Sequence, residues 1–136
     1  MTSALTIENI EVVYNHSVQA LRGMSIEVPE GKIVALLGSN GAGKTTTLKA
    51  VTGTQAVAAG DIEFMGKSIK GQGPWDLVRQ GLVMVPEGRG TFTRMTITEN
   101  LQMGAFIRDD KAQIELDIEE VFRIFPRLKE RRNQLA

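Results

Sequence analysis

The sequence of 136 residues contains no cysteine and only one tryptophan, one tyrosine and one histidine. The lack of cysteine excludes a disulfide framework and thiolate metal sites. Sixteen basic and sixteen acidic residues cancel, so no bulk charge favours nucleic acid as a partner. No apolar run approaches the ~20 residues of a transmembrane helix, and the N-terminus lacks the basic and apolar regions of a signal peptide. These absences predict a cytosolic protein whose role at a membrane is peripheral.

What is present begins with a phosphate-binding loop. Residues 38–45 read Gly-Ser-Asn-Gly-Ala-Gly-Lys-Thr and match the pattern G-x-x-x-x-G-K-[ST]. The apolar run Ile33–Leu37 before the loop predicts a strand buried on both faces, and residues 46–51 after it predict a helix. Glycines let backbone N–H groups converge on an anion, and a helix N-terminus adds partial positive charge. We expect Lys44 to reach the β- and γ-phosphates of a nucleotide and the Thr45 hydroxyl to ligate Mg²⁺.

The remaining elements follow from hydrophobic period and turn residues. Thr96 and Glu99 form a capping-box pattern that opens a helix, and Pro126 closes the last amphipathic helix. Strands are predicted at 5–14, 19–28, 60–66 and 82–85, and helices at 74–80, 97–106 and 112–125. The single histidine, His16, falls in a turn and is expected to be solvated. The order predicts an α/β nucleotide-binding domain with a helical extension.

Four motifs in this order resemble the ATP-binding subunits of ABC transporters. They are an aromatic residue ending the first strand (Tyr14), the loop at 38–46, Val-Pro-Glu-Gly-Arg at 85–89 and Met-Thr-Ile-Thr-Glu-Asn-Leu at 95–101. The glutamate in Val-Pro-Glu-Gly-Arg is typical of the branched-chain amino-acid importers. Most ABC ATPases carry a glutamine at this position. The resemblance covers the whole chain, and the combination of motifs is specific although the phosphate loop alone is not.

The resemblance implies roles for individual residues. Tyr14 would stack on adenine, with a core tyrosine as the alternative reading, and Ala20 would line the adenine–ribose site. Glu87 would reach toward Mg²⁺ and the attacking water and would assist catalysis together with Lys44. A glutamate in place of glutamine leaves open how that position coordinates the metal. The implied nucleotide-binding residues are Tyr14, Ala20, Gly38, Ser39, Asn40, Gly41, Ala42, Gly43, Lys44, Thr45 and Thr46, with Thr45 and Glu87 as metal ligands.

The resemblance also implies a fold and partners. The expected fold is a P-loop NTPase core with N-terminal antiparallel strands over residues 1–86, followed at 87–136 by the glutamine-loop region and the start of a helical subdomain. Its helices, at 97–107 and 112–125, would dock onto transmembrane permease subunits on the inner face of the cell membrane. A second ATPase subunit would complete the dimer, and a periplasmic binding protein would act indirectly.

Three family motifs do not occur in these residues: the Leu-Ser-Gly-Gly-Gln signature, a Walker B strand ending in Asp-Glu, and the switch histidine. We therefore expect the N-terminal half of an ATPase subunit that couples ATP hydrolysis to uptake of branched-chain or related amino acids. The alternative is a nucleotide-binding or interaction fragment without turnover. A third reading is another P-loop enzyme, but a GTPase is disfavoured because no Asn-Lys-x-Asp motif is present, and a small-molecule kinase because no lid or acceptor site is found. Without further strands, the runs at 33–37 and 82–85 should have open edges and exposed apolar faces.

Overall fold

The protein is described here by a computed structural model that covers residues 2–136 and divides into two units, one ending at Val85 and the other spanning Pro86–Ala136. The first unit contains β1 (Ser3–Tyr14), β2 (Val18–Pro29), α1 (Lys44–Val51), β3 (Ala59–Phe64), β4 (Lys67–Ser68) and α2 (Pro74–Arg79). The second contains α3 (Ile97–Gly104), α4 (Lys111–Ile124) and α5 (Pro126–Glu130). None of these helices is long and apolar enough to cross a membrane.

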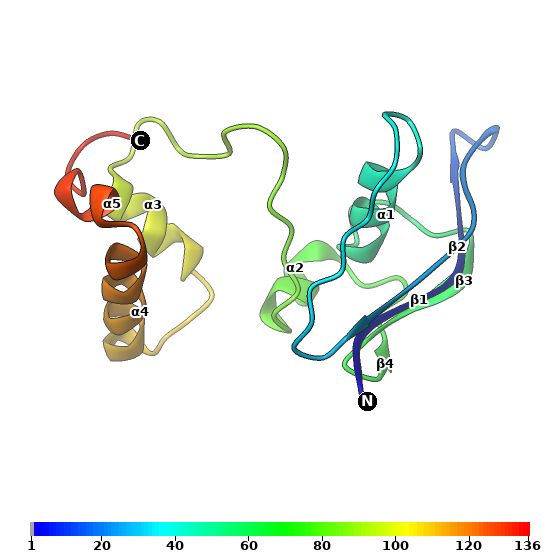
Figure 1. Cartoon of the computed structure of the whole chain (residues 1–136), viewed down its shortest axis with the longest axis horizontal. Helices are drawn as coiled ribbons and strands as arrows, with labels where there is room; N and C mark the ends of the chain where they lie inside the picture. The colour runs from blue at the N-terminus through cyan, green and yellow to red at the C-terminus, as the bar shows by residue number, and fades with distance from the viewer. Residues whose placement is uncertain (1) are drawn as a thin grey trace. The chain divides into compact units, whose positions relative to one another are not determined.

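The first unit is built on an antiparallel sheet in the order β2-β1-β3-β4 (Figure 1). The turn between β1 and β2 is closed by a hydrogen bond of 3.1 Å from the Ser17 N–H to the Tyr14 carbonyl. The predictions of strands at 5–14, 19–28 and 60–66 and of the turn after Tyr14 are confirmed. The two-residue strand β4 was not predicted, because Lys67 and Ser68 are too few to show a period.

A β-bulge in β1 sets which side chains enter the core. Asn9 has φ of 46°, and the pairing of β1 with both neighbours shifts across it. The shift lets Ile7 and Ile10, three positions apart, both point inward, where strict alternation would expose one of them. Gly60 lies against the bulge with φ of 84°, and a Cβ there would come within 2.4 Å of the Asn9 carbonyl oxygen. Only glycine fits this approach of two strands.

The core of this unit lies between the sheet and two helices. Ala50 and Val51 from α1 and Leu77 from α2 pack against the inward residues of β1 and β3. The buried members of this core are Ile7, Ile10, Val12, Leu21, Ala50, Val51, Ile62, Ile69 and Leu77. Packing against α1 fixes the start of that helix relative to the β1–β2 hairpin, and this arrangement positions the site described below.

The two strands predicted at 33–37 and 82–85 are absent from the structure. Both segments are irregular, and Ile33, Leu37 and Val85 are 100%, 88% and 90% exposed. The reason is that a buried parallel strand needs neighbours on both edges, and neither segment pairs with a strand among residues 2–136. The prediction of buried strands there is wrong for this structure. The further expectation, that these runs would expose their apolar faces, agrees with the exposure of Ile33, Leu37 and Val85.

The second unit is helical, as the sequence predicted. The capping box is formed: the Glu99 N–H donates to Thr96 Oγ1 at 3.1 Å, and the Thr96 N–H donates to Glu99 Oε2 at 2.7 Å. Helix α3 ends at Gly104, slightly earlier than predicted, and α4 ends at Ile124, ahead of Pro126, which opens the short helix α5.

Residues 131–136 return to the start of α3. The N–H of Ile97 donates to the Gln134 carbonyl at 3.0 Å, and the N–H of Ala136 donates to the Met95 carbonyl at 3.1 Å. The Thr98 hydroxyl adds a bond of 3.0 Å to the Arg132 carbonyl. The segment therefore runs beside the N-terminus of α3, where Thr96 and Leu135 form an isolated antiparallel bridge.

Candidate nucleotide-binding site

The loop at residues 38–45 turns sharply before α1 because two of its glycines adopt left-handed backbone conformations. Gly41 has φ of 84° and Gly43 has φ of 96°. A Cβ on Gly43 would come within 2.6 Å of Leu21 Cδ2, so the loop lies directly against β2. The Ala42 N–H donates to the Ser39 carbonyl at 3.1 Å and closes the turn. The phosphate-loop pattern is thus realised as a loop that only glycine at 43 permits.

Lys44 begins α1, and its side chain folds back over the loop. Its Nζ donates to the Gly38 carbonyl, and it lies 3.3 Å from the Ser39 carbonyl. Gly43 is the N-cap residue of α1, and no side chain within residues 2–136 caps this end of the helix. The first N–H groups of the helix are therefore available to a ligand, and the ammonium lies over the loop that precedes them. This arrangement favours a phosphate.

The three threonines after Lys44 have different surroundings. The Thr47 side chain is buried, and its hydroxyl donates to the Gly43 carbonyl at 2.8 Å. The Thr46 hydroxyl lies 3.1 Å from the Tyr14 hydroxyl and is partly buried. Thr45 is exposed. Of the three, the Thr45 hydroxyl is therefore the one left for an external ligand such as a metal ion.

A cavity of about 570 Å³ joins the phosphate loop to the end of the β1–β2 hairpin. It brings Tyr14 and Ala20, the two residues assigned to the base and ribose, together with the loop and the first turn of α1. Its lining residues are Tyr14, Val18, Gln19, Ala20, Asn40, Gly41, Gly43, Lys44, Thr45 and Thr46. Three predicted residues, Gly38, Ser39 and Ala42, belong to the loop but do not line the cavity.

Two of the lining residues were missed from the sequence. Val18 and Gln19 begin β2 immediately after the turn that follows Tyr14. Val18 is 59% exposed. Both residues lie between Tyr14 and Ala20 in the sequence, and the assignment of those two to the site could have indicated that Val18 and Gln19 also line it.

The donors at this site fit a nucleotide phosphate with its metal ion better than a metal ion alone. Within residues 2–136 no three His, Cys, Asp or Glu side chains come together as a metal site. A hard cation such as Mg²⁺ is commonly held by one or two protein oxygens and by substrate phosphates. The Thr45 hydroxyl can supply one such oxygen. Glu87 lies in the second unit, in an exposed stretch without regular structure.

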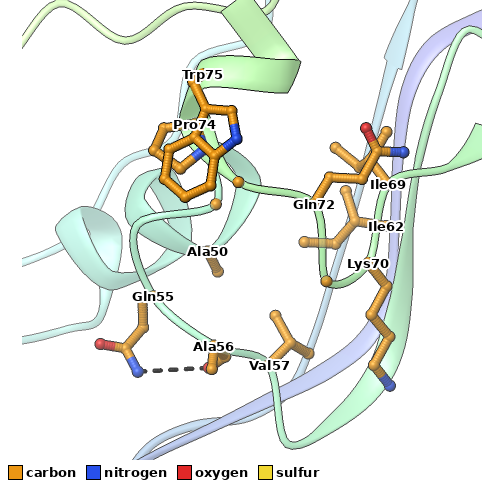
Figure 2. A pocket seen from close by; sticks show the side chains of 13 residues that line it. Ala50, Gln55, Ala56, Val57, Ile62, Ile69, Lys70, Gln72, Pro74 and Trp75 are labelled. Atoms are coloured by element: carbon orange, nitrogen blue, oxygen red, sulfur yellow. Dashed lines mark hydrogen bonds between the residues drawn. The ribbon is translucent and has the colours of Figure 1, made fainter.

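A second cavity of about 410 Å³ lies between the end of α1 and the segment leading into α2 (Figure 2). Ala50, Ile62 and Ile69 form its apolar wall, while Trp75 lies over its edge and is 69% exposed. The Lys70 ammonium donates to the Gly60 carbonyl at 2.8 Å instead of entering the cavity. None of the predicted site residues lines this space.

The chain is similar in sequence and in fold to known ATP-binding proteins. The chain is 41% identical to the high-affinity branched-chain amino acid transport ATP-binding protein BraG of Pseudomonas aeruginosa, over 97% of this chain and 56% of BraG. A solved ATP-binding subunit of an ABC transporter is similar over 98% of this chain and 54% of its own, with 28% identity and a TM-score of 0.83. A nucleotide-free ATP-binding cassette is similar over 99% of this chain and 58% of its own, with 26% identity and a TM-score of 0.77.

The chain therefore spans about half the length of the relatives that it matches. Its own sequence matches the profile described as ABC transporter over residues 21–135, which include the phosphate loop, α1 and all three helices of the second unit. This match covers most of the chain, and the chain belongs to the ABC transporter family.

Proposed function

We propose that this chain binds ATP with Mg²⁺ in the cavity between the phosphate loop and the β1–β2 hairpin. The observation that carries the proposal is the meeting of Tyr14 and Ala20 with Lys44 around one space of about 570 Å³. A nucleotide has an aromatic base, a sugar and an anionic chain, and the same cavity is lined by an aromatic residue, a lysine and the first turn of a helix.

Each residue has a part in this proposal. The backbone of residues 38–46 holds the phosphates, and the Lys44 ammonium leaves the loop carbonyls to bind them. Thr45 supplies an oxygen to Mg²⁺, and Glu87 assists as a second oxygen ligand and as a guide for the attacking water. The bound metal would neutralise charge that develops on the phosphates during transfer. Glu87 is assigned through the family motif alone.

We further propose that the chain serves an importer of branched-chain or related amino acids. The support is its similarity to BraG, which is named as a branched-chain amino acid transport ATP-binding protein. In this proposal ATP hydrolysis drives uptake, permease subunits and a second ATPase subunit are partners, and the chain lies on the cytoplasmic face of the membrane. A periplasmic binding protein takes part indirectly.

The alternative is binding without turnover by the polypeptide of these 136 residues. It is favoured because, among the described residues, no group of three His, Cys, Asp or Glu side chains could hold a metal ion. Phosphate release with the Lys44→Ala variant as blank distinguishes the two. Turnover well above that blank supports hydrolysis by these residues, and binding without it supports the alternative.

Binding itself is tested with a fluorescent ATP analogue. Lys44→Ala removes a charge-assisted contact worth on the order of 1.5–3 kcal/mol, so affinity should fall by at least about tenfold. Lys49→Ala is the matched control, because Lys49 is an exposed lysine in the last turn of the same helix and does not line the cavity. Equal affinities for Lys44→Ala and Lys49→Ala would refute the site.

A further inference from the structure

The motif at residues 96–101 contains a side chain that the proposed function does not use. Asn100 lies in the first turn of α3 and is half-buried. Its Oδ1 accepts a hydrogen bond of 2.8 Å from the Phe92 N–H. Its Nδ2 lies 3.0, 3.3 and 2.9 Å from the carbonyl oxygens of Phe92, Met95 and Thr96. The two amide hydrogens are thus shared among three acceptors, and the carboxamide is fully engaged with backbone.

The contacts to Phe92 fix the backbone more firmly than a single bond would. The same carboxamide binds both the N–H and the carbonyl of Phe92, as a neighbouring strand would do. The Met95 N–H also donates to the Phe92 carbonyl, at 3.0 Å, and closes a turn. The orientation of this turn relative to α3 therefore depends on Asn100.

The stretch before this turn lacks the hydrogen bonds that fix the turn itself. Residues 86–91 are exposed, and none of the hydrogen bonds found within residues 2–136 involves their backbone. Glu87 lies in this stretch, so the turn at Phe92 is the first fixed point of the backbone after it. The position of Phe92 therefore fixes the C-terminal end of this stretch and limits how far the Glu87 carboxylate can reach.

We propose that Asn100 is a positioning residue for Glu87: its carboxamide clamps the turn at Phe92–Met95 and so holds one end of the loop that carries the Glu87 carboxylate. The inference rests on the proposed function, since it needs Glu87 to act on the metal-bound nucleotide. Its bonds to the loop give a reason for an asparagine at this position of α3.

The first test is amide hydrogen exchange at the turn. Asn100→Asp keeps the size of the side chain and adds an acid to the first turn of a helix, where it is tolerated, but it has no N–H to donate. We expect the Phe92 and Met95 amides to exchange roughly tenfold faster in Asn100→Ala, which removes both the acceptor of the Phe92 N–H and the donor to the loop carbonyls. Asn100→Asp keeps the acceptor of the Phe92 N–H, so its faster exchange should appear at Met95. Gln102→Glu is the control, because it makes the same amide-to-acid change at an exposed site in α3.

The second test is the gain in ATP affinity that Mg²⁺ produces, compared among the wild type, Glu87→Ala, Asn100→Asp and the double variant. We expect both single variants to reduce this gain severalfold and the double variant to lose no more than Glu87→Ala. Affinity without Mg²⁺ should be unchanged in Asn100→Asp. Unchanged exchange at Phe92 in Asn100→Ala, an unchanged gain in Asn100→Asp, or additive losses in the double variant would overturn the inference. If Glu87→Ala itself keeps the full gain, the inference fails together with the role of Glu87, while the Lys44 titration still decides whether the nucleotide site exists.

Discussion

At the scale of single residues, the site depends on side chains that have a packing role as well as a place in the cavity. The Tyr14 hydroxyl lies 3.1 Å from the Thr46 hydroxyl, so the tyrosine links the end of β1 to the first turn of α1. Tyr14 also lines the cavity. The two interpretations that the sequence left open, adenine stacking and core packing, can be separated by substitution.

Tyr14→Phe should keep the affinity for ATP, because it removes the hydroxyl and keeps the ring. Tyr14→Ala should weaken binding by roughly 1–3 kcal/mol, the range found for bases stacked on aromatic side chains. Affinity is measured by titration and stability by thermal unfolding without ligand. A large loss of stability in Tyr14→Ala with unchanged affinity of the folded protein would assign the ring to packing.

Gly43 is required by its backbone and by its neighbour. Gly43→Ala should cost about 1–2 kcal/mol for the left-handed backbone alone, and more for the contact with Leu21 Cδ2. Gly66→Ala is a matched control, because Gly66 has φ of 76° and no atom within 4 Å of its Cβ position. Thermal unfolding should show a larger loss for Gly43→Ala. Equal losses would mean that the loop does not press against β2 in solution.

At the scale of elements, local signals predicted the structure well wherever the reason for it is local. The turn after Tyr14, the capping box at Thr96 and the proline at the end of α4 are set by the residues themselves. The apolar runs at 33–37 and 82–85 were predicted as buried strands, and this was wrong, because burial depends on neighbouring strands that no local pattern reports. The bulge at Asn9 also escaped prediction, since it follows from pairing with β2 and β3.

In the candidate site, too, the features set by local sequence could be predicted and those set by tertiary packing could not. The phosphate loop could be predicted from its sequence because its glycines and lysine act within a few residues of each other. That Tyr14 and Ala20 would meet the loop came only from family resemblance, since the hairpin and the loop are joined through tertiary packing. Val18 and Gln19 were missed for that reason.

The start of α3 offers a test of a local element. Thr96→Ala removes one half of the capping box and should destabilise the second unit by about 1 kcal/mol. Glu99→Ala removes the other half, and the double variant should cost less than the sum, since each bond supports the other. Chemical denaturation monitored by helical circular dichroism gives the three values. Strict additivity would show that the two bonds form independently, and no loss would show that the cap is frayed in solution.

At the scale of the whole molecule, two exposed apolar segments dominate the expected behaviour of the polypeptide. Ile33, Leu37 and Val85 are almost fully exposed in segments whose sequence suits buried strands. Extended apolar chain with unpaired backbone groups is a template for pairing with another chain. A formal net charge of zero supplies no repulsion between copies. The polypeptide of these residues should therefore be prone to self-association.

We expect this polypeptide to form oligomers or aggregates at micromolar concentration, detectable by light scattering and sedimentation velocity. A triple variant with threonine at Ile33, Leu37 and Val85 should shift it toward the monomer, because threonine keeps the β-branched shape but removes much of the apolar area. Phe106→Thr is the control: Phe106 is 81% exposed, and it lies just after α3 in the sequence and belongs to neither segment. If Phe106→Thr disperses the protein as well as the triple variant does, general apolar exposure is the cause. A monodisperse wild-type monomer would contradict the prediction and would mean that in solution these segments are covered by the chain itself.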